Sequence, residues 1–155
     1  MKRIILMRHA KAYEGADDQN RALTSEGAKQ AYAISEKILS ASKELGFDPQ
    51  IILTSGAKRA YDTARILAGI LNRSEFLKIE KTLYDGGARE YMRILDTFFH
   101  SHDCLIIVAH NPTLSDLCTL LAHSWTKILT PAAALGLEFN ATIGEGSGKE
   151  LFYFD

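Results

Sequence analysis

The sequence predicts an α/β fold, namely a three-layer sandwich in which a mostly parallel central sheet is flanked by helices. Three apolar runs, at residues 4–7, 51–53 and 105–109, are typical of strands buried on both faces of a sheet. Segments with helical periodicity separate these runs, and strands that alternate with helices favour a parallel sheet. With 155 residues and neither repeats nor linkers, the chain is expected to form one domain over residues 1–155.

The first half of the chain is expected to contain two strand–helix units. In order, these comprise a strand at 4–7, a loop at 11–23, a helix at about 25–45, a strand at 51–53 and a helix at about 57–71. Thr24 is expected to cap the first helix, because a threonine side chain accepts a hydrogen bond from a free N–H group of the first turn. Gly46 is expected to end that helix, because glycine adopts the left-handed conformation without strain.

The second half is expected to add a helix, the central strand, another helix and a hairpin. In order, the elements are an extended segment at 77–83, a turn at 84–87, a helix marked by residues 91–98, a strand at 105–109, a helix from Pro112, and strands at 132–140 and 150–154. Asn111 is expected to cap the helix that Pro112 begins. The glycine-rich residues 144–148 are expected to join the last two strands as a hairpin.

Composition excludes several classes of partner. The net charge of −1 provides no basic field for nucleic acid or an anionic membrane surface. No apolar run approaches the ~20 residues that span a bilayer. The N-terminus lacks a signal-peptide pattern, and Cys104 and Cys118 lie in apolar surroundings without metal-ligand spacing. We therefore expect a cytoplasmic protein with two reduced core cysteines.

Charged and titratable side chains follow three of the predicted strands. Arg8 and His9 come directly after the first strand, Arg59 lies in the first turn after the second, and His110 follows the strand at 105–109. Because the carboxyl ends of parallel strands meet at one edge of a sheet, these side chains are expected to converge. Arginine provides a fork of donors that matches phosphate oxygens, and a neutral imidazole can attack phosphorus. The pattern predicts phosphoryl transfer, with His9 as nucleophile and the other three residues as the phosphate clamp.

Four motifs in the chain resemble those of the histidine phosphatase superfamily, which has the phosphoglycerate-mutase-like fold, and especially its small SixA-type phosphohistidine phosphatases. They are LMRHA at 6–10, DQNRALTSEG at 18–27, SGAKRAYDTA at 55–64 and VAHNPTLS at 108–115. The resemblance implies that His9 becomes phosphorylated and that water then releases inorganic phosphate, without a metal or organic cofactor. It also makes Ser55, Asn111 and, at the rim of the pocket, Arg21 candidate substrate-binding residues; an ion pair with Asp18 is the other reading of Arg21.

The chain departs from the family pattern at three points. Ala10 replaces the usual glycine of the first motif, and Gly56 stands where proline is common. No carboxylate stands out as a general acid, although Asp85 and Glu90 are the nearest candidates by their order along the chain. An imidazole leaving group, with a pKa of about 6.5, needs a proton donor less than an alkoxide does.

The lack of an acid and of a long lid insertion favours a phosphohistidine-containing protein as substrate, such as a phosphotransfer protein of a signalling system. Three alternatives stay open. A recognisable acid and an extra specificity loop would support a small-molecule phosphomonoesterase, and a non-catalytic phosphate-binding interaction domain would not need both histidines. A metal hydrolase built on His9 and His110 ranks last, because no cluster of Asp or Glu ligands accompanies them.

Overall fold

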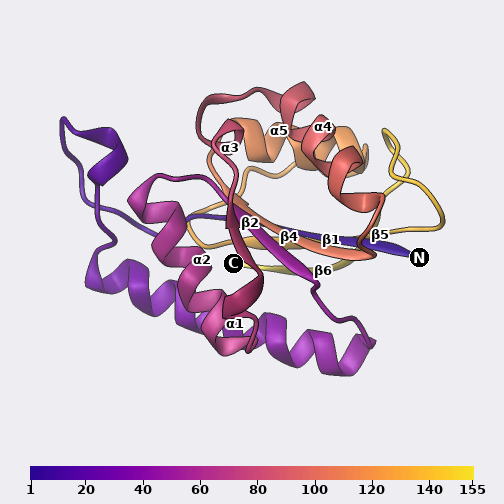
Figure 1. Ribbon diagram of the computed structural model, residues 1–155, viewed down its shortest axis with the longest axis horizontal. Helices are drawn as coiled ribbons and strands as arrows, with labels where there is room; N and C mark the ends of the chain where they lie inside the picture. Colours follow the sequence, from indigo (N-terminus) through magenta and orange to yellow (C-terminus); the bar gives the residue numbers. More distant parts are fainter.

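The computed structural model describes all residues from 1 to 155, and its centre is a six-stranded sheet (Figure 1). The strands are β1 (Lys2–Arg8), β2 (Ile51–Thr54), β3 (Leu77–Ile79), β4 (Cys104–Ala109), β5 (Ala134–Phe139) and β6 (Lys149–Phe154). They lie in the order β3-β2-β4-β1-β5-β6. The first four strands of this order are parallel to their neighbours, whereas β5 pairs antiparallel with β1 and β6. This confirms the mostly parallel sheet, the inner position of β4 and the C-terminal hairpin.

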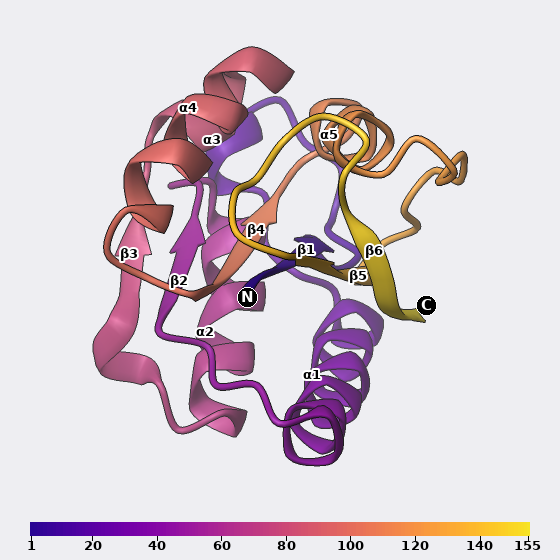
Figure 2. The ribbon, with the colours of Figure 1, turned by 90° about the vertical axis from the view of Figure 1, so that its right-hand side faces the viewer.

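Helices cover both faces of this sheet, which confirms the three-layer sandwich (Figure 2). The helices are α1 (Ser25–Leu45), α2 (Lys58–Ile70), α3 (Thr82–Asp85), α4 (Ala88–Phe99) and α5 (Thr113–Leu121), with 3₁₀ turns at Asp18–Asn20 and Ser74–Phe76. Helices α1 and α2 pack on one face, whereas α4 and α5 pack on the other. None of these helices combines the length and the apolar character that crossing a bilayer requires.

Strand β1 shows why an unbroken apolar run belongs in the middle layer. Successive side chains of a strand point to opposite faces. Ile4 and Leu6 accordingly join the core beneath α4 and α5, while Ile5 and Met7 join the core against α1 and α2. All four are at most 2% exposed, and burying each contributes roughly 1.5–3 kcal/mol. The strand that leads into the candidate site is therefore held firmly from both sides.

Local signals at the two ends of α1 act as the sequence predicts. The Thr24 hydroxyl accepts a hydrogen bond from the backbone N–H of Gly27 at 2.9 Å, and Gly46 ends the helix with a φ of 70°. Gly27 also faces the carbonyl oxygen of Lys11 so closely that a Cβ would clash with it. This contact fixes the polar segment between β1 and α1 against the start of α1.

Two boundary predictions in the second half of the chain are wrong. The end of the extended segment expected at 77–83 and the start of the turn expected at 84–87 instead form the short helix α3, Thr82–Asp85. Leu83 is fully buried in the core, and its carbonyl accepts a hydrogen bond from the Tyr91 hydroxyl at 2.5 Å. This long-range packing outweighs the local signal of alternating residues at 77–83.

Helix α5 begins at Thr113, one residue later than predicted. Asn111 still stabilises the first turn of the helix, because its Oδ1 accepts hydrogen bonds from the backbone N–H and the hydroxyl of Ser115. The two cysteines are buried and free, in agreement with the sequence interpretation.

Candidate active site

The sheet places His9 and His110 side by side. Strands β1 and β4 are parallel neighbours in which Arg8 pairs with Ala109, so the residues that follow these two leave the same edge together. The backbone N–H of His9 donates to the carbonyl of Ala109 at 3.1 Å. The centroids of the two imidazole rings lie 5.1 Å apart, with their planes tilted by 52°. Two buried imidazoles thus face one small region at the carboxyl edge of the sheet.

The surroundings of His9 leave one ring nitrogen free for nucleophilic attack. Its Nδ1 lies 2.8 Å from the carbonyl oxygen of Ala10, which can only accept, so Nδ1 carries the proton and Nε2 keeps its lone pair. Burial, together with the charges of Arg59 and Arg8, lowers the pKa of His9 to about 4. At neutral pH the ring is therefore uncharged, which is the form that attacks an electrophile.

His110 is held by Ser55, which comes from the loop after β2. The Ser55 hydroxyl lies 2.6 Å from Nε2 of His110 and accepts a hydrogen bond from the backbone N–H of Ala57 at 3.4 Å. The hydroxyl hydrogen can therefore point to Nε2, which leaves Nδ1 of His110 as an N–H donor. Burial, followed by the proximity of His9 and Arg59, lowers the pKa of His110 to about 3. A neutral His110 can donate a hydrogen bond without carrying a charge.

Arg8 and Arg59 bring two positive charges to the histidines. Arg59 lies in the first turn of α2 and is 6% exposed; its Nη1 and Nη2 donate to the carbonyl and carboxylate of Asp18 at 2.6 and 3.1 Å. Nη1 of Arg8 donates to the carbonyl of Leu129 at 3.0 Å. Both arginines are near enough to lower the pKa of both histidines.

Three buried donors of this cluster have no hydrogen-bond partner in the protein. They are Nε of Arg8, Nε of Arg59 and Nδ1 of His110, and the hydroxyl of Ser35 is the other buried side-chain atom in this condition. Buried polar groups in native proteins are nearly always paired. An oxyanion is the natural partner for two guanidinium groups and an imidazole N–H.

Asp18 is central to the site, although the sequence analysis named it only as a partner of Arg21. Its carboxylate accepts hydrogen bonds from the Tyr84 hydroxyl at 2.6 Å, from Arg21 at 3.1 Å and from Arg59 at 3.1 Å. The bonds from Tyr84 and Arg21 contribute most to holding the pKa of Asp18 well below its usual range. Asp18 lies inside the second motif, DQNRALTSEG, which was the available signal for it.

Tyr84 was missed altogether, since it belongs to none of the four motifs. Its ring meets the imidazole of His110 edge-on, with centroids 5.7 Å apart. The hydrogen bond from Tyr84 to Asp18 is the main cause that raises the pKa of this phenol, so its proton stays in place at neutral pH. Helix α3, which was expected to be a turn, is what carries Tyr84 to the site.

Arg21 and Asn111 lie around the cluster and make internal contacts. Arg21 forms the ion pair with Asp18 and also donates from Nε to the carbonyl of Tyr13 at 2.6 Å. The Asn111 amide donates to the Leu129 carbonyl at 2.8 Å, which is the oxygen that also receives Arg8. Their roles as substrate-binding residues stay predictions.

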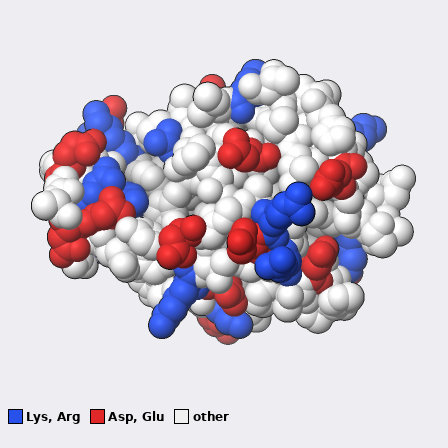
Figure 3. Space-filling model, turned by 90° about the horizontal axis from the view of Figure 1, so that it is seen from above, with Lys and Arg blue, Asp and Glu red and all other residues white.

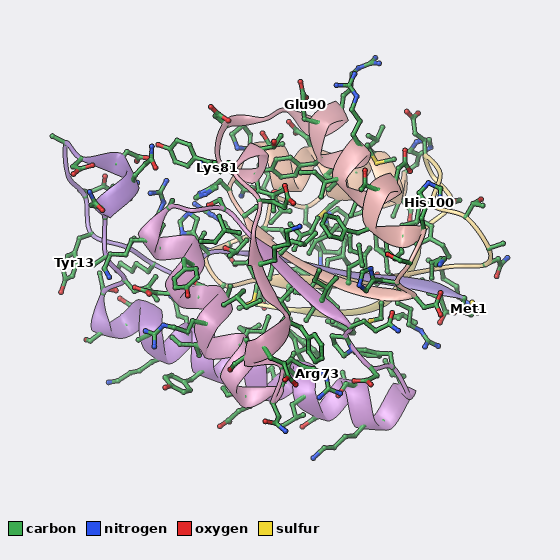
Figure 4. All side chains as sticks on the ribbon, viewed as in Figure 1. Met1, Tyr13, Arg73, Lys81, Glu90 and His100 are labelled. Atoms are coloured by element: carbon green, nitrogen blue, oxygen red, sulfur yellow. The ribbon has the colours of Figure 1, made fainter.

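The structure does not bring Glu90 to the histidines. Glu90 is exposed on α4, where its Oε2 accepts a hydrogen bond from the backbone N–H of Gly87 at 3.2 Å (Figure 4). Asp85 is exposed at the end of α3, next to Tyr84. Neither residue forms a hydrogen bond with His9 or His110.

Replacement of the motif glycine by Ala10 causes no backbone strain. Asn72 and Ala132 are the two non-glycine residues with a positive φ, so Ala10 has an ordinary conformation. Its methyl group is fully buried, and its N–H donates to the hydroxyl of Thr63 at 3.0 Å. Thr63 in turn donates to the carbonyl of Arg59, which ties the end of β1 to the start of α2.

Neutral imidazoles beside one buried and one half-buried arginine, at the carboxyl edge of a parallel sheet, are the groups that phosphoryl-transfer chemistry uses. Residues 4–85 match the family model of the histidine phosphatase superfamily (branch 1), and the chain belongs to this superfamily. Membership of this superfamily supports phosphatase activity. A sequence comparison with curated proteins finds no match. No group of three or more His, Cys, Asp or Glu side chains gathers closely enough to hold a metal ion.

Solved structures show the same fold at low sequence identity. The protein histidine phosphatase SixA, in complex with tungstate, is 19% identical with a TM-score of 0.82, over 97% of this chain and 95% of that one. A candidate phosphohistidine phosphatase SixA from Agrobacterium tumefaciens is 19% identical with a TM-score of 0.75, over 99% and 97%. A mycobacterial glucosyl-3-phosphoglycerate phosphatase is 18% identical with a TM-score of 0.70, over 97% and 96%. The fold is therefore the phosphoglycerate-mutase-like fold of SixA.

Proposed function

We propose that the protein is a phosphohistidine phosphatase that acts on a phosphorylated protein through a covalent phosphohistidine at His9. Nε2 of His9 attacks phosphorus, the P–N bond of the substrate breaks, and the substrate ring, protonated from solvent on its other nitrogen, leaves as neutral imidazole. Water then attacks the phosphorus on His9, and inorganic phosphate leaves. Arg8, Arg59 and His110 hold the phosphoryl oxygens in both steps.

The three unpartnered buried donors are the observation that carries this proposal. Nε of Arg8, Nε of Arg59 and Nδ1 of His110 come from β1, α2 and the end of β4; the His110 ring lies 5.1 Å from that of His9, and both arginines are near enough to lower the pKa of His9. A buried donor without a partner costs about 1–3 kcal/mol, so three around one ring favour a site shaped for an anion.

The protonation states of the site support phosphohistidine over an alkyl phosphate. Asp18 is ionised and cannot donate a proton, while the Tyr84 proton is engaged by Asp18. An alkoxide leaving group gains about 10²–10⁴-fold from a positioned acid, and no such acid touches the two histidines. An imidazole leaving group is much less basic, with a pKa of about 6.5.

A rapid-quench experiment with ³²P-labelled substrates tests the proposal. The substrates are a phosphohistidine protein, a phosphoserine peptide, a phosphotyrosine peptide and a sugar phosphate. We expect an acid-labile, base-stable phosphoenzyme that forms fastest from phosphohistidine. Faster turnover of the sugar phosphate would instead identify a small-molecule phosphomonoesterase, and binding without turnover would identify an interaction domain.

Two variants separate loss of the nucleophile from loss of the fold. His9→Ala is expected to abolish phosphate release while the protein stays folded, and His100→Ala, which changes an exposed histidine, is the matched control. Normal turnover by His9→Ala would remove the nucleophile assignment. Chelators are expected to leave the rate unchanged, and inhibition by a chelator would favour a metal hydrolase.

A further inference from the structure

The Asp18 carboxylate is the solvent-exposed partner of the buried Arg59 side chain. The Arg59 side chain is 7% exposed, whereas that of Asp18 is 47% exposed. Nη1 and Nη2 of Arg59 each donate one hydrogen bond to Asp18, and the buried Nε has no partner. Asp18 therefore takes up one of the two N–H groups on each terminal nitrogen of Arg59.

Arg21 is likewise engaged by oxygens of its own segment. Its Nη1 donates to Asp18, its Nε donates to the carbonyl of Tyr13, and its Nη2 lies 3.9 Å from the Glu14 carboxylate. Around the neutral imidazoles, Arg8, Arg21 and Arg59 each carry a positive charge, and Asp18 carries the negative charge that Arg21 and Arg59 share.

The hollow lined by Asp18 offers no cation for a second anionic group, although Lys81 lines the adjoining hollow that shares Gly56 and Tyr84 with it. Seven residues line the hollow beside Tyr84; they include the carboxylates Asp17 and Asp18 and no lysine or arginine. The hollow lies where the segment between β1 and α1 meets α3, at the end of the molecule where acidic and basic side chains gather in Figure 3. A leaving group that extends from the phosphorus toward this hollow meets negative charge.

We infer that Asp18 is a specificity-determining residue, which excludes substrates with a second negative charge beside the phosphoryl group and admits those whose neighbouring group is neutral or cationic. It does so by taking up N–H groups of Arg59 and Arg21 and by its own charge. The inference rests on the proposed function only in placing the phosphoryl group between Arg8 and Arg59. It concerns binding, so it can be tested without turnover.

Two probes that differ in one charge isolate this effect. They are 3-carbamoylphenyl phosphate and 3-carboxyphenyl phosphate, which have nearly the same shape, and calorimetry at pH 7.5 gives the dissociation constant of each. The readout is the ratio of the two constants, because any general change in phosphate affinity cancels in that ratio. In a partly solvated site, the repulsion between two like charges ~6 Å apart raises the dissociation constant by about tenfold.

The wild-type protein is expected to bind the carbamoyl probe more tightly, and Asp18→Asn is expected to reduce this preference by about tenfold. Glu36→Gln is the control, because it removes one exposed carboxylate on α1 that has no ion pair with Arg59 or Arg21. It is expected to keep the wild-type ratio. Tyr84→Phe, which removes one donor to Asp18 without changing the charge, is also expected to retain most of the preference.

Each outcome decides the inference separately from the proposed function. Tight binding with the same ratio in wild type and Asp18→Asn would overturn the role of Asp18 and leave the phosphatase intact. An equal change in Glu36→Gln would also overturn it. A shifted ratio in a protein that releases no phosphate would support the role of Asp18 while refuting the catalytic proposal. Failure of both probes to bind the wild type would refute both.

Discussion

Acidification from pH 7 to pH 5 is expected to destabilise the fold, because His9 and His110 are buried as neutral rings. The pKa of His9 is lowered to about 4 and that of His110 to about 3, in both cases mainly by burial. The unfolded chain therefore binds protons at these positions over a pH range in which the folded protein does not. Stability must fall as the pH drops below the unfolded value of about 6.5.

The size of this effect follows from proton linkage. At pH 5 an unfolded imidazole with a pKa of about 6.5 gains about 2 kcal/mol by protonation, while the folded rings gain almost nothing. The two histidines together then reduce the free energy of unfolding by about 4 kcal/mol, a large share of the ~5–15 kcal/mol that typical domains possess. Asp18 does not contribute in this window, because its lowered pKa makes stability fall only when the pH approaches the ordinary aspartate range, about 4.

Urea unfolding at pH 7 and pH 5 measures the loss. The buffers must be free of phosphate and similar oxyanions, because a ligand of the folded state would add stability of its own. His9→Gln and His110→Gln are each expected to halve the pH-dependent loss, and the double variant to remove most of it. His100→Gln, at an exposed position, is expected to behave as wild type. A double variant that loses as much stability as the wild type would refute the assignment of two buried neutral imidazoles.

Three further predictions concern single side chains. Arg59→Lys keeps the charge but loses the planar fork, so kcat/KM for a phosphohistidine peptide is expected to fall by about 10²–10³-fold in steady-state assays. Ser55→Ala removes the group that orients His110 and is expected to lower kcat by about tenfold with little change in KM; an unchanged kcat would contradict this positioning role. Ala10→Gly restores the family residue, yet it is expected to lower the free energy of unfolding by about 1 kcal/mol, because the methyl group is fully buried and φ is not positive. Urea titration checks this last value, and a more stable glycine variant would show that Ala10 is strained.

The strands that lead to the site could be predicted from the sequence because their signals are local. The apolar runs of β1, β2 and β4 are long enough to require burial on both faces, and Thr24 and Gly46 mark the ends of α1 by their own side-chain and backbone preferences. The rule that parallel strands share a carboxyl edge then sufficed to bring His9 and His110 together. The order of the strands in the sheet did not follow from these signals, since it depends on how distant segments pack.

The contacts that complete the site were decided by tertiary structure alone. Asp18 contacts Arg59, 41 positions away in the sequence, and Tyr84, 66 positions away. Asp18 lies in a 3₁₀ turn and Tyr84 in a helix of four residues. Such short elements carry no periodic pattern, so nothing in the neighbouring residues indicates that they will meet. The free nitrogen of His9 likewise depends on where the Ala10 carbonyl points in the folded chain. The sequence by itself determined which side chains lie at the edge of the sheet, because hydrophobic periodicity is local; packing decided their partners, protonation and charge balance, because those depend on segments brought together only by folding.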